Sequence, residues 1–395
     1  GRLKNTNPQV LTITHREMLR YLVDFAAHFG LDSTIECSAE VTKCRPLGFA
    51  GDAGWEVEIN SKETRRYAAV VSANGHHWSP NIPVYEGTFT GRMLHSYDYK
   101  RPDDFGSGGR VLVVGAGNSA CDLAVEAAQT FGHADISMRG GYWFFPKLIF
   151  GVPSANLTKW PIPSMLQKPF VRGFLAIAIG DTSRYGLPRP DHRLYSKDIT
   201  VNTTMLNALR HGRVSYRPAI ERIDDGTVSF VDGTNSEYDT VVWATGYHTV
   251  FPFLDTSVLR MQDGYPVLIK TIFVPGFSNI YIAGAATIRA VGGDVLPSFG
   301  RLIADAIAVQ RLVKTPIGAA LNYFLPATNE SLVGGASDVK PLLLLGTLAL
   351  RVVRFLSAMR YRWGRNRTDI AAPLAVSGGC DYRQEFTSSI KEIAV

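Results

Sequence analysis

The sequence predicts an α/β fold built on parallel strands, and three observations lead to this class. Short apolar runs, typical of strands covered on both faces, occur at 111–114 and 280–283. Segments with apolar residues at helical spacing follow these runs, at about 121–129 and 299–313. A glycine-rich turn joins the first run directly to its helix. Antiparallel meanders are expected as insertions between these units.

The N-terminal part is expected to hold one helix and two strands. Thr14 and Glu17 form a capping-box pattern at a helix start. Apolar residues then recur at helical spacing up to Gly30, a common helix stop: Met18, Leu22, Phe25 and Phe29. Residues 55–59 alternate apolar and polar, as a half-buried strand does, and the apolar run 67–71 indicates a strand covered on both faces.

Farther along the chain, segments 228–231 and 238–243 are both rich in β-branched and aromatic residues. Asp232 and Gly233 follow the first of them as a turn signal. The sequence therefore predicts a hairpin between these two segments.

The composition is that of a globular protein. Of the 395 residues, 46% are apolar and 19% are charged, which excludes a disordered, collagen-like or coiled-coil chain. The net charge of +6 is mild and gives no reason to expect nucleic acid as a partner. The four cysteines are scattered, with neither a C-x-x-C pair nor zinc-ligand spacing, so disulfide scaffolds and metal sites are disfavoured and a reducing, cytoplasmic setting fits best. No membrane span is expected.

Residues 115–120 match the dinucleotide-binding pattern G-x-G-x-x-G/A. Gly115 would permit the tight turn, Gly117 would let the backbone approach a pyrophosphate, and Ala120 would let the helix pack closely on the strand. Asn118 and Ser119 stand at the helix start, where they would hydrogen-bond pyrophosphate or cap the helix. The pattern closes a strand and opens a helix, the context that the motif requires, and a glycine-rich turn without ligand is the alternative.

The next expected strand ends at Arg139, 24 residues after Gly115. A NAD site places an acidic residue near this position, whereas an Arg pairs with the 2′-phosphate of NADP. The sequence therefore predicts NADP, with an exposed loop cation as the alternative. Lys147 is a weaker candidate for the same phosphate.

Phe89, Gly91, His95 and Tyr99 fit the pattern F-x-G-x-x-x-H-x-x-x-Y just ahead of the glycine-rich loop. Together with V-W-A-T-G-Y at 242–247, this pattern resembles the class B flavin-containing monooxygenase family, and the resemblance extends over about 14–313. Related Baeyer–Villiger enzymes usually carry Trp at the position of Tyr99, which favours the branch that oxygenates nitrogen or sulfur.

The resemblance implies FAD and NADP as cofactors, with O₂ and a small molecule as substrates. NADPH would reduce FAD, and the reduced flavin would capture O₂ as a C4a-hydroperoxide that oxygenates a soft nucleophile. Because the cofactor carries this chemistry, few side chains need to act as acid, base or nucleophile, and no catalytic residue is singled out. A Baeyer–Villiger enzyme, an uncoupled NADPH oxidase and a catalytically silent NADP-binding module stay open as alternatives.

By the same resemblance the chain would consist of two nested, doubly wound dinucleotide-binding domains. An FAD-binding domain is expected at 1–105 and 240–317, and an NADP-binding domain at 106–239. His95 would shape the link between these domains, with a hydrogen-bonded structural role as the alternative. Gly246 would mark the crossing back to the FAD domain, or would be an ordinary turn at a strand end. Gly284 would place backbone N–H groups near the flavin.

In one respect the chain departs from the family. Family members begin with an earlier G-x-G-x-x-G loop that holds the FAD pyrophosphate, and this sequence has none. The FAD domain is therefore expected to lack its first βαβ unit. Either the sequence is truncated, which the intact remainder of the FAD segments favours, or flavin binding has been lost.

Two further regions suggest contacts outside the cofactor sites. The stretch at about 141–215, with its aromatic start at Trp143 and Phe144, is expected to be a helical insertion that serves as a substrate lid, faces a membrane or simply packs. In the tail at 318–395, the apolar run 341–350 precedes a series of arginines. The segment 341–367 is expected to contact a membrane peripherally or to be a solvated helix face.

Overall fold

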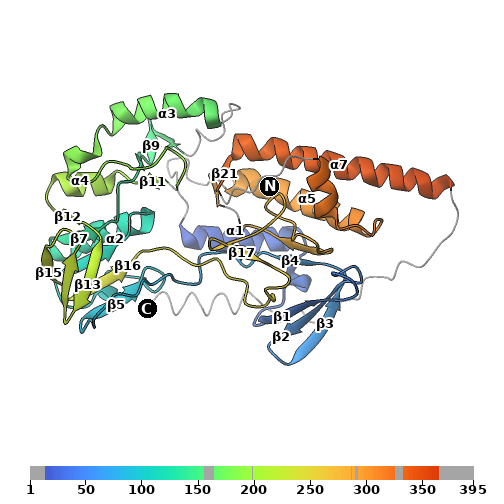
Figure 1. Ribbon diagram of the computed structural model, residues 1–395, viewed down its shortest axis with the longest axis horizontal. Helices are drawn as coiled ribbons and strands as arrows, with labels where there is room; N and C mark the ends of the chain where they lie inside the picture. The colour runs from blue at the N-terminus through green and yellow to red at the C-terminus, as the bar shows by residue number, and fades with distance from the viewer. Residues whose placement is uncertain are drawn as a thin grey trace.

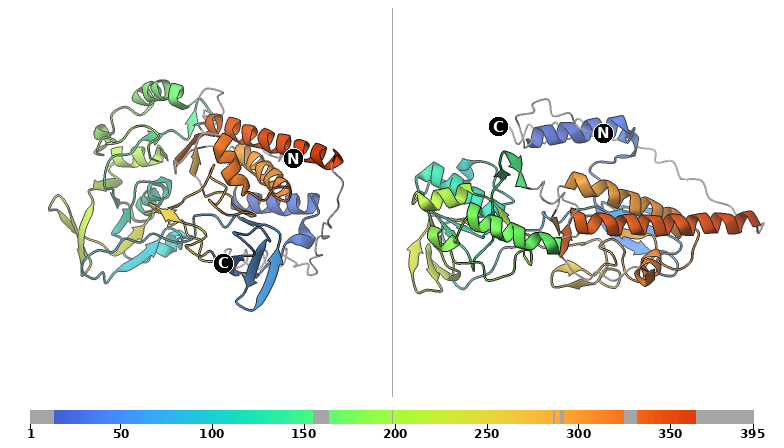
Figure 2. Two further views of the ribbon diagram at one scale, coloured as in Figure 1. Left: turned by 45° about the vertical axis from the view of Figure 1, so that its right-hand side comes forward. Right: turned by 90° about the horizontal axis from the view of Figure 1, so that it is seen from above.

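The structure, a computed structural model, describes residues 14–154, 164–197, 199–285, 287–289, 292–324 and 332–363. Figure 1 shows two lobes joined by extended segments. The sheet lobe comprises the described residues within 84–244, and the helix lobe comprises those within 39–83 and 245–363. Helix α1 (His15–His28) stands off both lobes when the molecule is seen from above (Figure 2).

A five-stranded sheet forms the centre of the sheet lobe, with strand order β12-β7-β6-β16-β5. The strands are β5 (Arg92–His95), β6 (Val111–Val114), β7 (Ala134–Ser137), β12 (Val214–Arg217) and β16 (Thr240–Trp243). All neighbours pair in parallel. Along the chain, β7 and β12 follow β6 on one side of it, and β16 then pairs with β6 on its other side. This reversal of strand order between β6 and β16 creates a switch point, where ligands of doubly wound folds bind.

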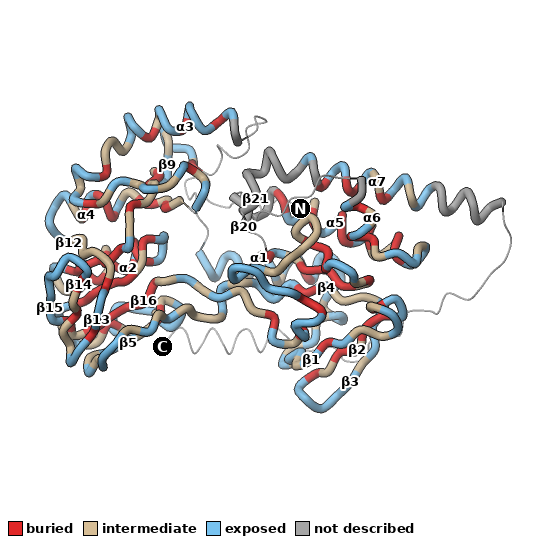
Figure 3. Tube along the Cα trace, in the orientation of Figure 1, coloured by how far each residue is buried: buried red, intermediate tan, exposed pale blue. Residues whose placement is uncertain are grey.

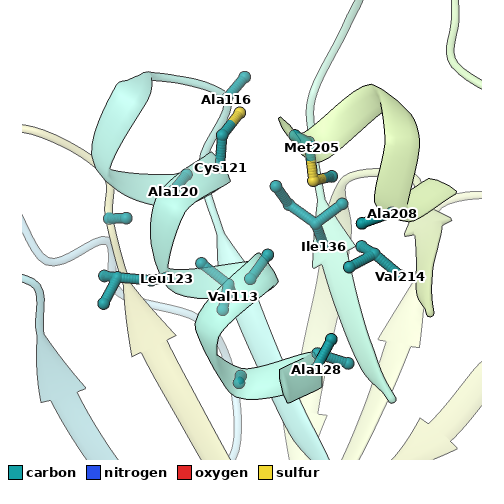
Figure 4. Packing of buried hydrophobic residues seen from close by; sticks show 14 of the residues in the cluster. Val113, Ala116, Ala120, Cys121, Leu123, Ala128, Ile136, Met205, Ala208 and Val214 are labelled. Carbon is teal, nitrogen blue, oxygen red and sulfur yellow. The ribbon is translucent and has the colours of Figure 1, made fainter. Parts of the chain in front are cut away.

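The two faces of this sheet are covered differently. Helices α2 (Asn118–Phe131) and α4 (Thr204–Arg210) cover one face, and small side chains of α2 let it approach closely (Figure 4). Cys121 is one of these packed residues, and burial raises the pKa of its thiol to about 12. The other face carries the antiparallel meander β13 (Ile220–Asp224), β14 (Thr227–Phe230) and β15 (Asn235–Glu237).

An insertion between β7 and β12 extends the sheet lobe. It contains β8 (Phe144–Phe145), β9 (Leu148–Ile149), β10 (Val152–Pro153), α3 (Ser164–Ala178), the 3₁₀ turn η4 (Thr182–Tyr185) and β11 (Thr200–Val201). Strands β9 and β10 form a hairpin, and β8 pairs with β11 in parallel. The insertion is therefore mixed rather than purely helical.

The helix lobe combines a meander, a parallel strand pair and a helical layer. The meander is β1 (Val41–Pro46), β2 (Trp55–Ile59) and β3 (Glu63–Tyr67). Strand β4 (Val70–Ser72) pairs in parallel with β19 (Ile280–Ile282). Helices α5 (Gly292–Gln310), α6 (Ile317–Phe324) and α7 (Ala336–Trp363) pack over this pair, and the positions of their buried residues are red in Figure 3.

Short elements complete the described chain. They are the 3₁₀ turns η1 (Asp32–Thr34) and η2 (Pro102–Phe105) and the strands β17 (Met261–Gln262), β18 (Tyr265–Pro266), β20 (Thr287–Arg289) and β21 (Leu332–Gly335).

The structure confirms the α/β class, the capping box of α1 and the buried strands 111–114 and 280–282. Two expectations were wrong. The run 67–71 is not one strand: Tyr67 ends β3 and Val70 starts β4, and Val71 is 44% exposed. The hairpin predicted between 228–231 and 238–243 does not form, because β14 turns back onto β15 while β16 joins the central sheet.

Candidate cofactor site

The glycine-rich loop lies at the switch point of the sheet. Gly115 directly follows β6 and has a φ of +140°, which residues with side chains rarely adopt. A Cβ atom there would stand 2.3 Å from the carbonyl oxygen of Ala244, which follows β16. Ala120, fully buried, packs against the same turn, so the loop, α2 and both strand ends fit only with small residues at these positions.

The N-terminus of α2 is open to a ligand. Gly117 is the N-cap residue, and no side chain among the described residues caps the helix. Apart from its chain neighbours, no described heavy atom lies within 4 Å of a Cβ built there. Ser119 in the first turn is exposed, and the first turn holds no acidic residue. Free N–H groups and the positive end of the helix dipole therefore point to a space that suits a phosphate group.

The side chain of Asn118 does not cap the helix. Its Oδ1 atom accepts a hydrogen bond from the backbone N–H of Val201, 2.7 Å away. Nearby, the buried Oγ1 atom of Thr200 donates to the carbonyl oxygen of Ala116 at 2.7 Å. The loop is thus fixed from outside by β11, which lies more than 80 residues farther along the chain.

A second support of the loop comes from Asn202, which is fully buried. Its Nδ2 atom donates to Asp122 on α2 at 2.7 Å, and its Oδ1 atom accepts from the N–H of Met205 in α4. The sequence reasoning missed Thr200 and Asn202. The only local signal was an Asn shortly before a helical segment, which is common at helix starts.

Arg139 lies two residues beyond β7, at the same edge of the sheet as the glycine-rich loop. Its side chain is exposed and makes no hydrogen bond or ion pair with the residues that the structure describes. Burial raises the pKa of Tyr85, and the positive charge of Arg139 acts against this rise. Tyr85 in turn stacks on the buried Trp243 at the end of β16. Lys147 pairs with Asp122 on α2.

His95 connects the sheet to the crossing between the lobes. It is 1% exposed, and its Nδ1 atom accepts a hydrogen bond from the N–H of Tyr97 at 3.1 Å. The ring proton therefore sits on Nε2, which donates to the carbonyl oxygen of Gly246 at 3.0 Å. Burial lowers the pKa of His95, which keeps the imidazole neutral.

The two crossing segments lie side by side. Pro80 and Tyr247 form an antiparallel bridge, the N–H of Asn81 donates to the carbonyl of Gly246, and the N–H of His248 donates to Ser79. The hydroxyl of Thr245 also donates to the carbonyl of Asn81. His95 therefore fixes one carbonyl within a two-stranded connection between the lobes.

The other residues of the F-x-G-x-x-x-H-x-x-x-Y pattern lie just before and after the edge strand β5. Phe89 packs on the meander side of the sheet, whereas Tyr99 packs on the α2 side, 4.7 Å from the ring of Phe105. A Cβ at Gly91 would stand 2.6 Å from the carbonyl oxygen of Asp239. The pattern thus describes how β5 is held, and of its four residues His95 alone reaches the crossing.

Gly284 follows β19 in the helix lobe. The Nδ1 atom of His76, from the first crossing segment, lies 3.1 Å from its carbonyl oxygen. Gly284 is therefore apart from the glycine-rich loop but connected to the crossing.

The predicted site residues of the sheet lobe lie close together. The structure gathers Gly115, Gly117, Asn118, Ser119, Ala120 and Arg139 at one edge of the sheet and places Gly246 at the adjoining crossing.

A family profile described as "Flavin-binding monooxygenase-like" matches residues 4–312. The chain belongs to this family. Human flavin-containing monooxygenase 1 is 31% identical over 302 residues, covering 72% of this chain and 56% of that protein. Mouse dimethylaniline monooxygenase [N-oxide-forming] 2 is 31% identical over 304 residues, covering 70% of this chain and 54% of that protein. The chain thus spans about half the length of these curated relatives.

Solved structures confirm the fold. A flavin-containing monooxygenase from Stenotrophomonas maltophilia matches with a TM-score of 0.53 and 17% identity, covering 86% of this chain and 77% of that chain. An oxidized steroid monooxygenase bound to NADP matches with a TM-score of 0.61 and 17% identity, covering 89% and 84%. This member of the flavin-binding monooxygenase-like family therefore has the doubly wound, dinucleotide-binding architecture expected from its sequence.

Proposed function

We propose that this chain binds NADPH at the carboxyl ends of β6, β7 and β16 and works with FAD as a monooxygenase. The reaction would consume NADPH, H⁺ and O₂, transfer one oxygen atom to a nitrogen or sulfur atom of a small molecule, and release NADP⁺ and water. The observation that carries the proposal is the open N-terminus of α2 beside the Gly115–Ala244 contact, with the exposed Arg139 at the same edge.

Each residue of this site would have one task. Backbone N–H groups at Gly117, Asn118 and Ser119 would bind the pyrophosphate, and Arg139 would pair with the 2′-phosphate. Gly115 and Ala120 would allow the close approach of strand and helix, and His95 would position Gly246. None of these side chains needs to exchange a proton with substrate, in line with the neutral state of His95.

FAD, when bound, supplies the oxygen chemistry, and the described residues include fewer groups suited to bind it than groups suited to bind NADP. The ends of the parallel strands β4 and β19, with Gly284 and the adjoining His76, are the fitting place in the helix lobe. Within the described residues, the glycine-rich phosphate loop at 115–120 has no counterpart there. Among the described residues, the NADP site is therefore the more complete of the two.

The division into cofactor domains is part of this proposal. The expected NADP-binding range was 106–239, with the FAD-binding domain at 1–105 and 240–317. Strands β5 and β16 belong to the five-stranded sheet although they lie outside that range. We therefore propose that the NADP-binding unit also takes in 92–95 and 240–243, and that the crossing segments around Asn81 and Gly246 mark its borders.

The test is a spectrum of the purified chain after incubation with FAD, followed by anaerobic NADPH and then air. Retained flavin absorbance that NADPH bleaches would support the proposal, and an amine or a sulfide should then yield an N-oxide or a sulfoxide. Dimethylaniline and thioanisole are suitable probes. Lactone formation from cyclohexanone would instead indicate a Baeyer–Villiger enzyme, and peroxide without product would indicate an uncoupled oxidase.

A catalytically silent NADP-binding module is the second candidate. The observation in its favour is that the sequence has one glycine-rich dinucleotide loop, and the structure places it in the sheet lobe. Tight binding of NADP⁺ without retention of FAD would support this candidate and contradict the monooxygenase.

We also propose a cytoplasmic chain that contacts a membrane peripherally through 341–367. Helix α7 supports this, because it carries exposed apolar side chains and arginines together. Residues 364–367 lie outside the described residues. No helix in the described part of the chain is long and apolar enough to cross a membrane.

A further inference from the structure

The positive charge of the chain is concentrated in two stretches without any acidic residue. These stretches, 136–180 and 339–368, contain 12 of the 41 Lys and Arg residues and none of the 35 Asp and Glu residues. The remainder of the chain therefore has a net charge of −6 although the whole chain has +6. The first stretch spans the β9–β10 hairpin and α3, and the second spans most of α7.

The first stretch exposes large apolar side chains. Phe150 forms the tip of the β9–β10 hairpin and is 97% exposed, with Leu148 and Val152 exposed beside it. Helix α3 packs on the sheet lobe through Val171 and Leu175. Its exposed side carries Leu166, Phe170 and Ile177, at spacings of four and seven residues that line them up along one face of the helix, and the exposed cations Lys168 and Arg172.

Helix α7 is apolar on two opposite faces. One face packs on α5 through buried residues such as Leu343 and Leu350. The outward face carries exposed apolar residues at helical spacing: Leu344, Leu345, Leu348, Val352 and Phe355. Arg351 at the border of this face also pairs with Asp305 of α5 at 3.2 Å. A surface helix normally turns polar residues outward, so this face is suited to an apolar surrounding.

The two helices that carry these faces lie along the same edge of the molecule. Helices α3 and α7 lie along the upper edge in Figure 1, one over each lobe, and run nearly in line when seen from above in Figure 2. In Figure 3, exposed residues recur along α3 and along the coloured part of α7. We call the edge formed by the β9–β10 hairpin, α3 and α7 the basic apolar edge.

We propose that the basic apolar edge docks on the surface of an anionic lipid bilayer, with Phe150 and the exposed faces of α3 and α7 inserted at the headgroup level. This inference rests on the peripheral contact proposed for 341–367, adds the hairpin and α3 as a second contact, and is independent of the oxygenation chemistry. Apolar side chains together with cations, here in two stretches of the sequence that contain no acidic residue, are the combination that binds such surfaces.

A lipid surface fits this edge better than a second copy of the chain does. A two-fold dimer through the edge would bring the same positive stretches together, and the like charges would repel. A protruding aromatic tip such as Phe150 also requires a matching pocket in a protein partner, whereas a fluid bilayer accepts it without one.

Vesicle flotation tests the proposal with the purified chain and no cofactor. Vesicles of phosphatidylcholine alone are compared with vesicles that also contain phosphatidylglycerol, at low and high salt. The triple variant Phe150→Ser/Phe170→Ser/Ile177→Ser removes apolar side chains from the hairpin and α3. The double variant Phe49→Ser/Val84→Ser is the control, because these side chains are 87% and 96% exposed and lie outside both stretches.

We expect binding to the anionic vesicles, weakening with salt, and an affinity about tenfold lower for the triple variant than for the control. Equal binding of the two variants, or no binding by the unaltered chain, would overturn the proposal. A change of oligomeric state in the triple variant would show that a second copy covers the edge instead. Affinity for NADP⁺, measured in parallel, should be the same in all three proteins, so failure here is distinct from failure of the monooxygenase proposal.

Discussion

The Nε2 atom of His95 lies 3.0 Å from the carbonyl oxygen of Gly246, although 151 residues separate the two in the chain. This hydrogen bond joins the edge strand of the sheet to the second crossing between the lobes. The carbonyl of Gly246 also accepts the N–H of Asn81 from the first crossing. One buried imidazole thus stabilises the point where both crossings meet.

Replacement of His95 by Leu should destabilise the protein by about 1–3 kcal/mol, because two hydrogen bonds are lost. The N–H of Tyr97 loses its acceptor, and the carbonyl of Gly246 loses one of its donors. His95→Gln should cost less, since its amide still offers a donor. Urea denaturation followed by circular dichroism measures both. If the Leu and Gln variants unfold at the same urea concentration as the unaltered chain, the bond contributes nothing to stability.

Stability should also depend on pH through His95. Burial lowers the pKa of this group in the folded state below its ordinary value of 6.5. The unfolded chain therefore takes up a proton at a pH where the folded chain does not, and the free energy of unfolding falls as the pH drops below that value. Above it, His95 makes no pH-dependent contribution. In urea titrations at several pH values, the slope on the acidic side should be shallower for His95→Gln; an unchanged slope would assign the effect to other groups.

Replacement of Gly115 and of Gly117 by Ala should have different effects on stability and on NADP⁺ binding. Gly115→Ala places a Cβ 2.3 Å from the Ala244 carbonyl at a φ of +140°, so it should destabilise the fold by about 1–3 kcal/mol and abolish NADP⁺ binding. Gly117→Ala meets open space at a φ of −76°, so stability should change by about 0.5 kcal/mol or less. Its methyl group would nevertheless occupy the phosphate space, and NADP⁺ affinity should fall about tenfold. Calorimetric binding with NADP⁺ separates the two effects, and undiminished binding by Gly117→Ala would move the pyrophosphate elsewhere.

The sequence predicted those features that depend on neighbouring residues. The capping box of α1 and the turn at Gly115 involve residues a few positions apart, and both lie where they were expected. The hairpin expected for 238–243 failed because Thr240 pairs with Val111 and Arg92, each more than 120 residues away. Strand pairing over such distances leaves no local pattern, and the same holds for the Thr200–Ala116 bond across 84 residues. The apolar residues at helical spacing in α1 predicted the helix correctly. They did not predict its environment, since Met18, Leu22 and Phe25 are exposed.

Arg139→Ala should lower the affinity for NADP⁺ about ten- to hundredfold and leave the affinity for NAD⁺ unchanged, because the 2′-phosphate is the group that the guanidinium would bind. Arg110→Ala is a matched control: this exposed Arg pairs with Glu237 at 2.8 Å and precedes β6, at the opposite end of the strands. Fluorescence titration with both nucleotides gives the ratio. Equal losses for NADP⁺ and NAD⁺ would show that Arg139 does not read the 2′-phosphate.

Thr200 supplies the sharpest test of how the glycine-rich loop is held. Its buried Oγ1 donates to the carbonyl of Ala116 at 2.7 Å, and Thr200→Val removes this bond without changing the side-chain shape. The Ala116 carbonyl then lacks a partner, which should cost about 1–3 kcal/mol of stability and loosen the loop that meets the pyrophosphate. Thr182→Val is the control, because the hydroxyl of this buried residue donates to the Pro188 carbonyl at 3.1 Å, outside the loop. Both variants should lose stability, but NADP⁺ affinity should fall several-fold for Thr200→Val alone. A comparable loss of affinity in Thr182→Val would mean that general destabilisation, rather than the position of the loop, weakens binding.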